Sequence, residues 1–184
     1  MTQTAPKNRK KTSRRTAGVG PVVSAAHLAA GEMPALSEME FAVTMMVNAY
    51  QRWMVRCMAA AGVEGLSSLE VQLLHSVNHR SRAKTMADLC LVLNIEDTHT
   101  VSYALKKLEK AGLIETGRRG KEKTARITQT GEEMCLQYRE LREALLVKPM
   151  KELGLDEAEL SRLAATLRSV SGYYDQGARA ATAM

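Results

Sequence analysis

Apolar residues recur every three or four positions along most of the chain after residue 33, which predicts a mainly helical protein. Several of these stretches begin with Ser or Thr followed three residues later by Glu or Asp, a pattern typical of helix N-termini. The predicted helices cover about 37–60, 67–78, 85–93, 97–111, 130–148 and 155–176. Residues 113–116 and 124–128 flank a basic, glycine-containing turn and predict a β-hairpin.

The predicted helix 97–111 has two contrasting sides. Val101, Ala104, Leu105, Leu108 and Ala111 share one side, and His99, Ser102, Tyr103, Lys106 and Lys110 share the other. The polar side is basic, has hydrogen-bonding groups near its N-terminus and carries no acid at its centre, as expected of a helix that lies in a DNA major groove. The preceding helix and the short turn make this pair a helix-turn-helix candidate.

The first and last predicted helices have apolar faces that must pack against another part of the assembly. The helix 37–60 is apolar on nearly all sides, so either a second subunit or a ligand pocket with adaptable Met walls would cover it. In the last helix the a/d-type spacing suits a bundle between subunits; it is carried by Leu160, Leu163, Leu167, Val170 and Tyr174.

The formal charge of +6 is uneven along the 184 residues. Six Lys and Arg side chains lie between Lys7 and Arg15 without an acid, and the rest of the chain is neutral. Residues 1–32 lack periodicity and predict a disordered arm, either a solubilising tail or a source of phosphate contacts. Residues 79–126 hold 11 basic and 6 acidic side chains, which favours a polyanionic partner.

Other features limit the possible functions. The three cysteines, Cys57, Cys90 and Cys135, are widely spaced, which favours a reducing compartment. Without a signal peptide pattern or a long apolar run, we expect a soluble cytoplasmic protein that does not enter a membrane. No catalytic set, metal-ligand set or cofactor motif is evident, so we expect neither an enzyme nor a cofactor.

Some residues support two interpretations. His75 and His79 have metal-ligand spacing on a helix, but they lack further ligands, so we expect a solvated helix face. Cys57 is either a redox sensor whose thiolate Arg56 or Arg52 stabilises or, as the apolar surroundings favour, a small buried residue. Aromatic and thioether walls beside cations would suit an anionic effector, although core packing explains them equally well; this candidate set is Tyr50, Arg52, Trp53, Met54 and Arg56.

The order of four helices, a basic hairpin and two long helices resembles the MarR family of winged-helix transcription regulators, over roughly residues 34–176. Residues 100–114 (TVSYALKKLEKAGLI) resemble the family's recognition helix and first wing strand, and residues 127–131 (ITQTG) resemble the end of its wing. Residues 153–160 (LGLDEAEL) are similar to the start of its last helix. The hairpin lacks the Asp-x-Arg pattern usual at the family's wing tip.

The resemblance implies a homodimer on a pseudo-palindromic operator, and in many members a small anionic or phenolic effector releases the DNA. It implies base-edge contacts from His99, Thr100, Ser102 and Tyr103 and backbone contacts from Lys106 and Lys107. Together with the charged hairpin, the predicted DNA-binding set is Thr98, His99, Thr100, Ser102, Tyr103, Lys106, Lys107, Lys110, Arg118, Arg119, Lys121 and Lys123.

The predicted fold is therefore mainly α with a small β-hairpin wing. We expect the arm 1–32 to precede one MarR-like domain at 33–184, with a dimerisation helix at 33–62, a winged helix-turn-helix lobe at 66–131 and C-terminal dimerisation helices at 132–176. The expected function is that of a homodimeric, DNA-binding repressor. The alternative is a winged-helix adaptor that docks an acidic protein, which the Arg and Lys content of the hairpin disfavours.

Overall fold

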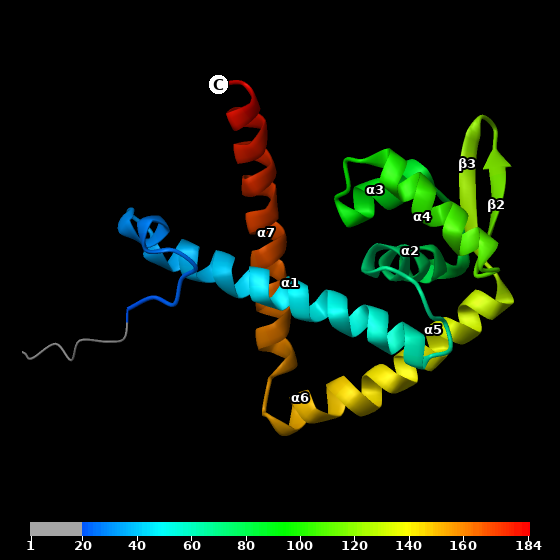
Figure 1. Ribbon diagram of the computed structural model, residues 1–184, viewed down its shortest axis with the longest axis horizontal. Helices are drawn as coiled ribbons and strands as arrows, with labels where there is room; N and C mark the ends of the chain where they lie inside the picture. Colours follow the sequence, from blue (N-terminus) through cyan, green and yellow to red (C-terminus); the bar gives the residue numbers. More distant parts are fainter. Residues whose placement is uncertain (1–19) are drawn as a thin grey trace, which may run out of the picture. The chain divides into compact units, whose positions relative to one another are not determined.

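The computed structural model describes residues 20–184. These residues fall into two compact units, 20–50 and 51–184, and the boundary lies inside helix α1 (Pro34–Ala60). In the first unit a 3-10 turn, η1 (Ala26–Ala30), precedes α1 (Figure 1). Residues 1–19 of the predicted basic arm lie outside the described residues, so the arm stays a prediction.

Helix α1 begins three residues earlier than the sequence pattern predicts. Pro34 occupies its first turn, where a missing N–H costs nothing because that group would have no helical partner. The expected N-cap, Ser37, is instead buried inside the helix. Its hydroxyl donates a hydrogen bond to the Leu28 carbonyl at 2.6 Å, which ties η1 to α1.

The DNA-binding lobe predicted at 66–131 contains three helices with complete N-terminal caps. Ser67 and Thr85 each form a reciprocal capping box with the acid three residues later, and the Asp97 carboxylate caps the third helix. The helices therefore begin where the sequence predicts; they are α2 (Ser68–Asn78), α3 (Met86–Leu93) and α4 (Thr98–Lys110).

The sheet has three antiparallel strands in the order β1-β3-β2, one more strand than the sequence predicts. The strands are β1 (Lys84–Thr85), β2 (Ile114–Arg119) and β3 (Glu122–Ile127). Arg119 pairs with Glu122, so only two residues form the turn, and the hairpin strands are longer than predicted. Gly120 begins that turn at φ +62°, a backbone conformation that favours glycine. The two-residue β1 has no period-2 pattern long enough to be recognised in the sequence.

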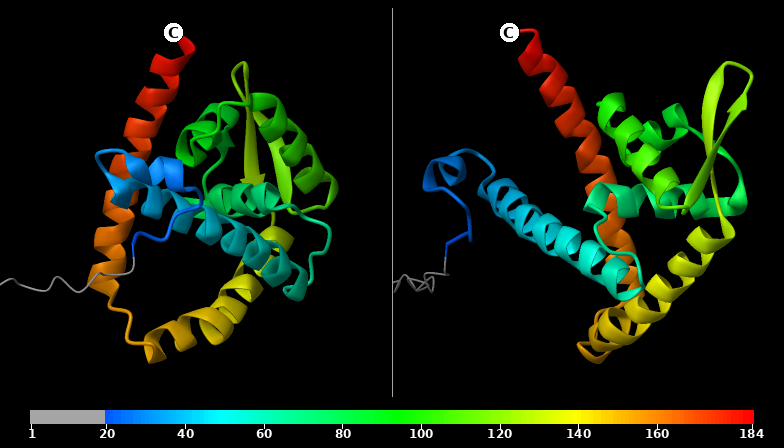
Figure 2. Two further views of the ribbon diagram at one scale, coloured as in Figure 1. Left: turned by 60° about the vertical axis from the view of Figure 1, so that its left-hand side comes forward. Right: turned by 45° about the vertical axis from the view of Figure 1, so that its right-hand side comes forward.

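One apolar core holds the lobe together. Val101, Ala104 and Leu108 on the inner side of α4 are at most 3% exposed, as the amphipathic pattern predicts. They belong to the same cluster as residues of α2, the hairpin base and the C-terminal end of α1, including Met54 and Met58. The outer side of α4 is exposed to solvent. The hairpin extends beyond α2, α3 and α4 (Figures 1 and 2).

The C-terminal third is helical almost without interruption. Helix α5 (Gln129–Arg142) passes through a π-helical segment, η3 (Glu143–Val147), into α6 (Lys148–Glu152). The sequence predicts that Pro149 kinks or interrupts this helix, because proline has no N–H to donate. The α-helical pattern does stop before it, at Arg142, and Pro149 lies in the first turn of α6, after the π segment. Helix α7 (Glu157–Thr182) extends beyond the expected end near residue 176 through a run rich in alanine, a strong helix former.

Within residues 20–184 no helix is both long enough and apolar enough to cross a membrane. In the same range, no group of three His, Cys, Asp or Glu side chains is placed to hold a metal ion.

Candidate nucleic-acid interface

The outer face of α4 presents a row of polar and cationic side chains to solvent. His99, Tyr103, Lys106 and Lys110 are exposed, Tyr103 to 71%, whereas Ser102 is half-buried. Thr98 and Thr100 are also exposed, in the first turn. The face has no carboxylate at its centre, and its length of 13 residues suits a groove-reading helix.

The acid at the start of α4 is engaged by the helix itself. The Asp97 carboxylate accepts the backbone N–H groups of His99 at 2.9 Å and Thr100 at 3.3 Å, and the Thr100 hydroxyl at 2.5 Å. Hydrogen bonds from the Thr100 hydroxyl and these N–H groups hold the pKa of Asp97 below its usual range. Its negative charge therefore caps the positive end of the helix dipole.

Lys107 turns away from the solvent-facing row, although the sequence placed it in the DNA-binding set beside Lys106. Its ammonium donates to the Glu70 carboxylate at 2.9 Å and to the Gly65 carbonyl at 2.7 Å. The Lys107 side chain is 41% exposed, and that of Glu70 only 6%. We therefore assign Lys107 to the joint between α2 and α4 and omit it from the proposed DNA contacts.

Glu70 has two structural tasks at that joint. It accepts the backbone N–H of Ser67 at 2.6 Å in the capping box of α2 and also binds Lys107. Burial alone would raise the pKa of Glu70, but the hydrogen bonds from Lys107 and Ser67 outweigh burial and lower it. Glu70 is therefore ionised at neutral pH and anchors α4. The signal in the sequence that could have pointed to this contact was the acid at the third position of a capping box, Glu70 after Ser67.

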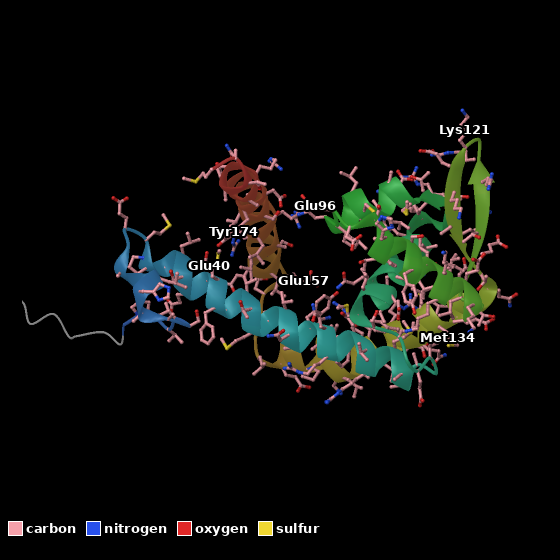
Figure 3. All side chains as sticks on the ribbon, turned by 45° about the horizontal axis from the view of Figure 1, so that its top comes forward. Glu40, Glu96, Lys121, Met134, Glu157 and Tyr174 are labelled. Atoms are coloured by element: carbon pink, nitrogen blue, oxygen red, sulfur yellow. The ribbon has the colours of Figure 1, made fainter. Side chains whose placement is uncertain are left out.

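The hairpin carries the second group of cations. Arg118, Arg119, Lys121 and Lys123 are all exposed, and Lys121 lies at the tip (Figure 3). Arg119 approaches Glu122 at 3.4 Å. Both side chains are more than half exposed, so this ion pair contributes little to stability.

A groove of about 560 Å³ joins α4 to the hairpin, and Ser102, Lys106, Lys121 and Lys123 all line it. The structure thus brings together residues predicted from two separate stretches of sequence. Two contacts outside the predicted set hold the hairpin against α4. The Thr116 hydroxyl and N–H both donate to the Glu109 carboxylate, and the Thr128 hydroxyl donates to the Gly112 carbonyl at 2.7 Å.

The five residues that the sequence predicts to bind an effector differ in their exposure to solvent. Met54 is 1% exposed in the lobe core, where its thioether packs rather than lining an accessible surface, and Trp53 packs partly buried against that core. Arg52 and Arg56 are exposed. Tyr50, in the other unit, is 47% exposed.

The expected solvated face around His75 is wrong. The His75 ring contacts Tyr138 edge-on, with ring centroids 4.5 Å apart, and its Nε2 is buried without a hydrogen-bond partner among the described residues. Burial lowers the pKa of His75. Its neighbour at helical spacing, His79, is exposed beyond the end of α2. The sequence period could not reveal that α5 covers this side of α2.

Two thiols are buried. The Cys57 thiol lies 3.7 Å from the Tyr138 carbonyl oxygen, and burial raises its pKa. Burial also raises the pKa of Cys135 to about 11. Since the thiolate is the reactive form, both environments suppress reactivity, in agreement with a packing role.

The comparisons with known proteins agree with this geometry. Residues 66–131 match the family model described as a winged helix DNA-binding domain. Similar solved structures include BldR from Sulfolobus solfataricus, at 17% identity over 76% of this chain and 99% of that chain, with a TM-score of 0.62. CouR from Rhodococcus jostii RHA1, bound to p-coumaroyl-CoA, has 13% identity over 72% and 90% of the two chains, with a TM-score of 0.60.

A MarR-family transcriptional regulator from Rhodococcus sp. RHA1 is similar as well, at 12% identity over 72% of this chain and 91% of that chain, with a TM-score of 0.59. The comparison with curated proteins finds no significant match.

The chain therefore contains a winged-helix DNA-binding domain, formed by α2, α3, α4 and the hairpin. Around that domain it has the fold of MarR-family transcription regulators, which confirms the predicted fold class and, at the level of the fold, the family resemblance.

Proposed function

We propose that the protein is a homodimeric repressor that binds a pseudo-palindromic operator. The observation that carries this proposal is the exposed polar row on α4, whose Lys106 lines one groove with Lys121 and Lys123 of the hairpin. In this arrangement α4 lies in the major groove, where His99, Ser102 and Tyr103 contact base edges. Lys106 and Lys110 contact phosphates, and the hairpin cations follow the neighbouring backbone or minor groove.

The exposed apolar helices support the dimer. In the first unit, α1 exposes Met45, Met46, Val47 and Tyr50, each by more than 40%. Helix α7, all of which the structure describes, has no buried residue although Leu160 and Leu163 lie on its a/d-type seam. Apolar helix faces of this kind are stable in water only when covered, and a second copy would cover both.

We also propose that a small molecule releases the DNA. Bound p-coumaroyl-CoA in the similar structure CouR supports an effector in this fold. The exposed cations Arg52 and Arg56 remain candidates for contacting it, while the buried Met54 contributes to the core.

The test is selection of bound duplexes from a pool of genomic fragments, followed by a gel-shift titration at two salt concentrations. We expect an enriched inverted repeat whose half-sites lie about one helical turn apart. Heparin serves as the competing polyanion. Failure to enrich any sequence, with equal binding to heparin and DNA, would contradict a sequence-specific regulator and favour the adaptor alternative.

A further inference from the structure

Helix α7 packs only loosely against the rest of its own chain. The structure describes all of α7, and none of its residues is buried. Three of them are half-buried, namely Ala164, Val170 and Asp175. Every other residue between 171 and 182 is exposed, so a charged side chain is the best covered one in this part of the helix. Because aspartate ordinarily stays in solvent, another element must cover Asp175.

The turn between α3 and α4 covers Asp175. The side-chain amide of Asn94 donates to both carboxylate oxygens of Asp175, at 3.3 Å each. The two residues are 81 positions apart in the sequence, so this contact joins the C-terminal half of α7 to the DNA-binding lobe. By contrast, the hydroxyls of Thr166 and Ser169 donate to carbonyls of α7 itself.

The backbone conformation of Asn94 leaves its side chain available for this contact. Asn94 ends α3 at φ 52° and ψ 50°, in the left-handed region that asparagine adopts more readily than most residues. Its N–H donates to the carbonyls of Cys90 and Leu91 and so closes the end of the helix. Since the backbone completes the helix end, the amide can bond to an acceptor outside the lobe.

The turn that carries Asn94 is rigid. The N–H of Ile95 donates to the Cys90 carbonyl at 2.9 Å, and the Ile95 side chain packs partly buried against the lobe core. Two residues later, the Asp97 carboxylate caps the first turn of α4. A displacement of Asn94 therefore turns α3 and α4 together instead of deforming the turn between them.

The lobe is consequently attached to α7 at two separate points. One attachment is covalent and runs through α5, η3 and α6. The other is the bond between Asn94 and Asp175, about five helical turns after the first residue of α7. With the covalent attachment alone the lobe could swing as a hinged body, and a second attachment far from the first restricts that motion.

We propose that Asp175 is a positioning residue for DNA recognition. By holding Asn94, it fixes the orientation of the lobe relative to α7 and thereby the spacing between half-sites that the dimer accepts. The spacing rests on the proposed function, in which α7 packs against a second copy through the seam that includes Leu160 and Leu163. Each base pair added between half-sites shifts one of them by about 3.4 Å and about 35°, so a lobe of fixed orientation favours one spacing.

The orientation can be measured without DNA. Spin labels at Lys110→Cys on α4 and Arg179→Cys on α7, both exposed positions, are attached in a Cys90→Ala background of the full-length chain. Labelled chains are diluted with unlabelled ones, so that double electron–electron resonance reports distances within one chain. We expect Asp175→Ala to broaden the distance distribution about twofold, because the lobe then moves as a hinged body. The control Gln176→Ala, at an exposed neighbour, should leave the width unchanged. Equal widths with and without Asp175 would overturn the proposal.

Binding to altered operators tests the consequence for recognition. The probes are the inverted repeat that the wild-type protein enriches, the same repeat with one base pair added or removed between its half-sites, and one half-site alone. We expect the wild type to bind the altered spacings about tenfold or more weakly, and Asp175→Ala and Asn94→Gly to reduce this difference to about threefold or less. Glycine retains the left-handed conformation that ends α3. Asp175→Asn, which keeps an acceptor for Asn94, should restore the wild-type preference.

The single half-site separates positioning from folding. Its affinity should change by less than about twofold in each variant, because no residue of the exposed α4 row is altered. An unchanged spacing preference in both Asp175→Ala and Asn94→Gly would overturn the proposal, and so would an equal loss of affinity for every probe, which a purely structural role predicts. If the wild type enriches no inverted repeat, the proposed function fails, and the spin-label widths then decide whether Asp175 fixes the lobe.

Discussion

The neighbouring lysines of α4 allow a direct test of which face reads DNA. Lys106 is exposed beside the hairpin groove, whereas Lys107 is bonded to Glu70 and to the Gly65 carbonyl. Replacing each by Met keeps most of the side-chain volume and removes one charge. We expect the Lys106 variant to fail in DNA binding and the Lys107 variant to fail mainly in stability.

The two variants are expected to change different quantities: Lys106→Met the salt dependence of DNA binding, and Lys107→Met the free energy of unfolding. Each lost phosphate contact lowers the slope of log K against log salt by about 0.9, so a dimer of the Lys106→Met variant should lose about 1.8. Its free energy of unfolding should change by less than about 0.5 kcal/mol, as for other exposed substitutions. Lys107→Met leaves the Glu70 carboxylate buried without its cation, which should cost about 1–2 kcal/mol after allowing for the half-exposed lysine.

Fluorescence anisotropy with a short random-sequence duplex measures the salt slope without knowledge of the operator, and urea titration measures stability. The cycle is completed by Glu70→Gln, which keeps an oxygen for the capping box, and by the double variant with Lys107→Met. We expect the second substitution to cost little once the first is made, because the two side chains share one interaction. An unchanged urea midpoint together with a reduced slope in Lys107→Met would refute the assignment of Lys107 to the α2–α4 joint.

Three further outcomes are expected. Gly131→Ala should destabilise the protein by about 3 kcal/mol or more, because the added Cβ would overlap a backbone carbonyl just before β2, while Gly172→Ala in open space should not destabilise it. Stability should fall as the pH drops below about 6.5, because the unfolded chain protonates His75 before the folded chain does, and His75→Phe should reduce this dependence. Iodoacetamide should modify Cys57 and Cys135 far more slowly in the native protein than in urea, as mass spectrometry of the labelled peptides would show.

Each of these outcomes has a clear contrary result. Equal unfolding midpoints for the two glycine variants would mean that the start of α5 is not packed as tightly as the structure shows. A pH dependence that persists in His75→Phe would assign the titration to another group. Rapid native alkylation of Cys57 would restore its candidacy as a redox sensor.

The helix boundaries and the polar face in the lobe could be predicted from the sequence, because each depends on residues that are close together along the chain. Capping boxes at Ser67 and Thr85 and the amphipathic period of α4 each depend on residues within a turn or two, so the helix starts and the polar face were predicted correctly. The glycine in the hairpin likewise marked the turn, since a φ of +62° at Gly120 favours that residue type.

Contacts between distant segments were decided only by the tertiary structure. Whether Lys107 faces DNA or Glu70 depends on how α2 packs against α4, and residues 37 positions apart leave no periodic signal. The same holds for His75, which α5 buries against Tyr138. A helical period specifies which residues share a face, but the partner that covers a face is set by packing. The sequence therefore determined the exposed polar row on α4, and the fold determined which lysines belong to it.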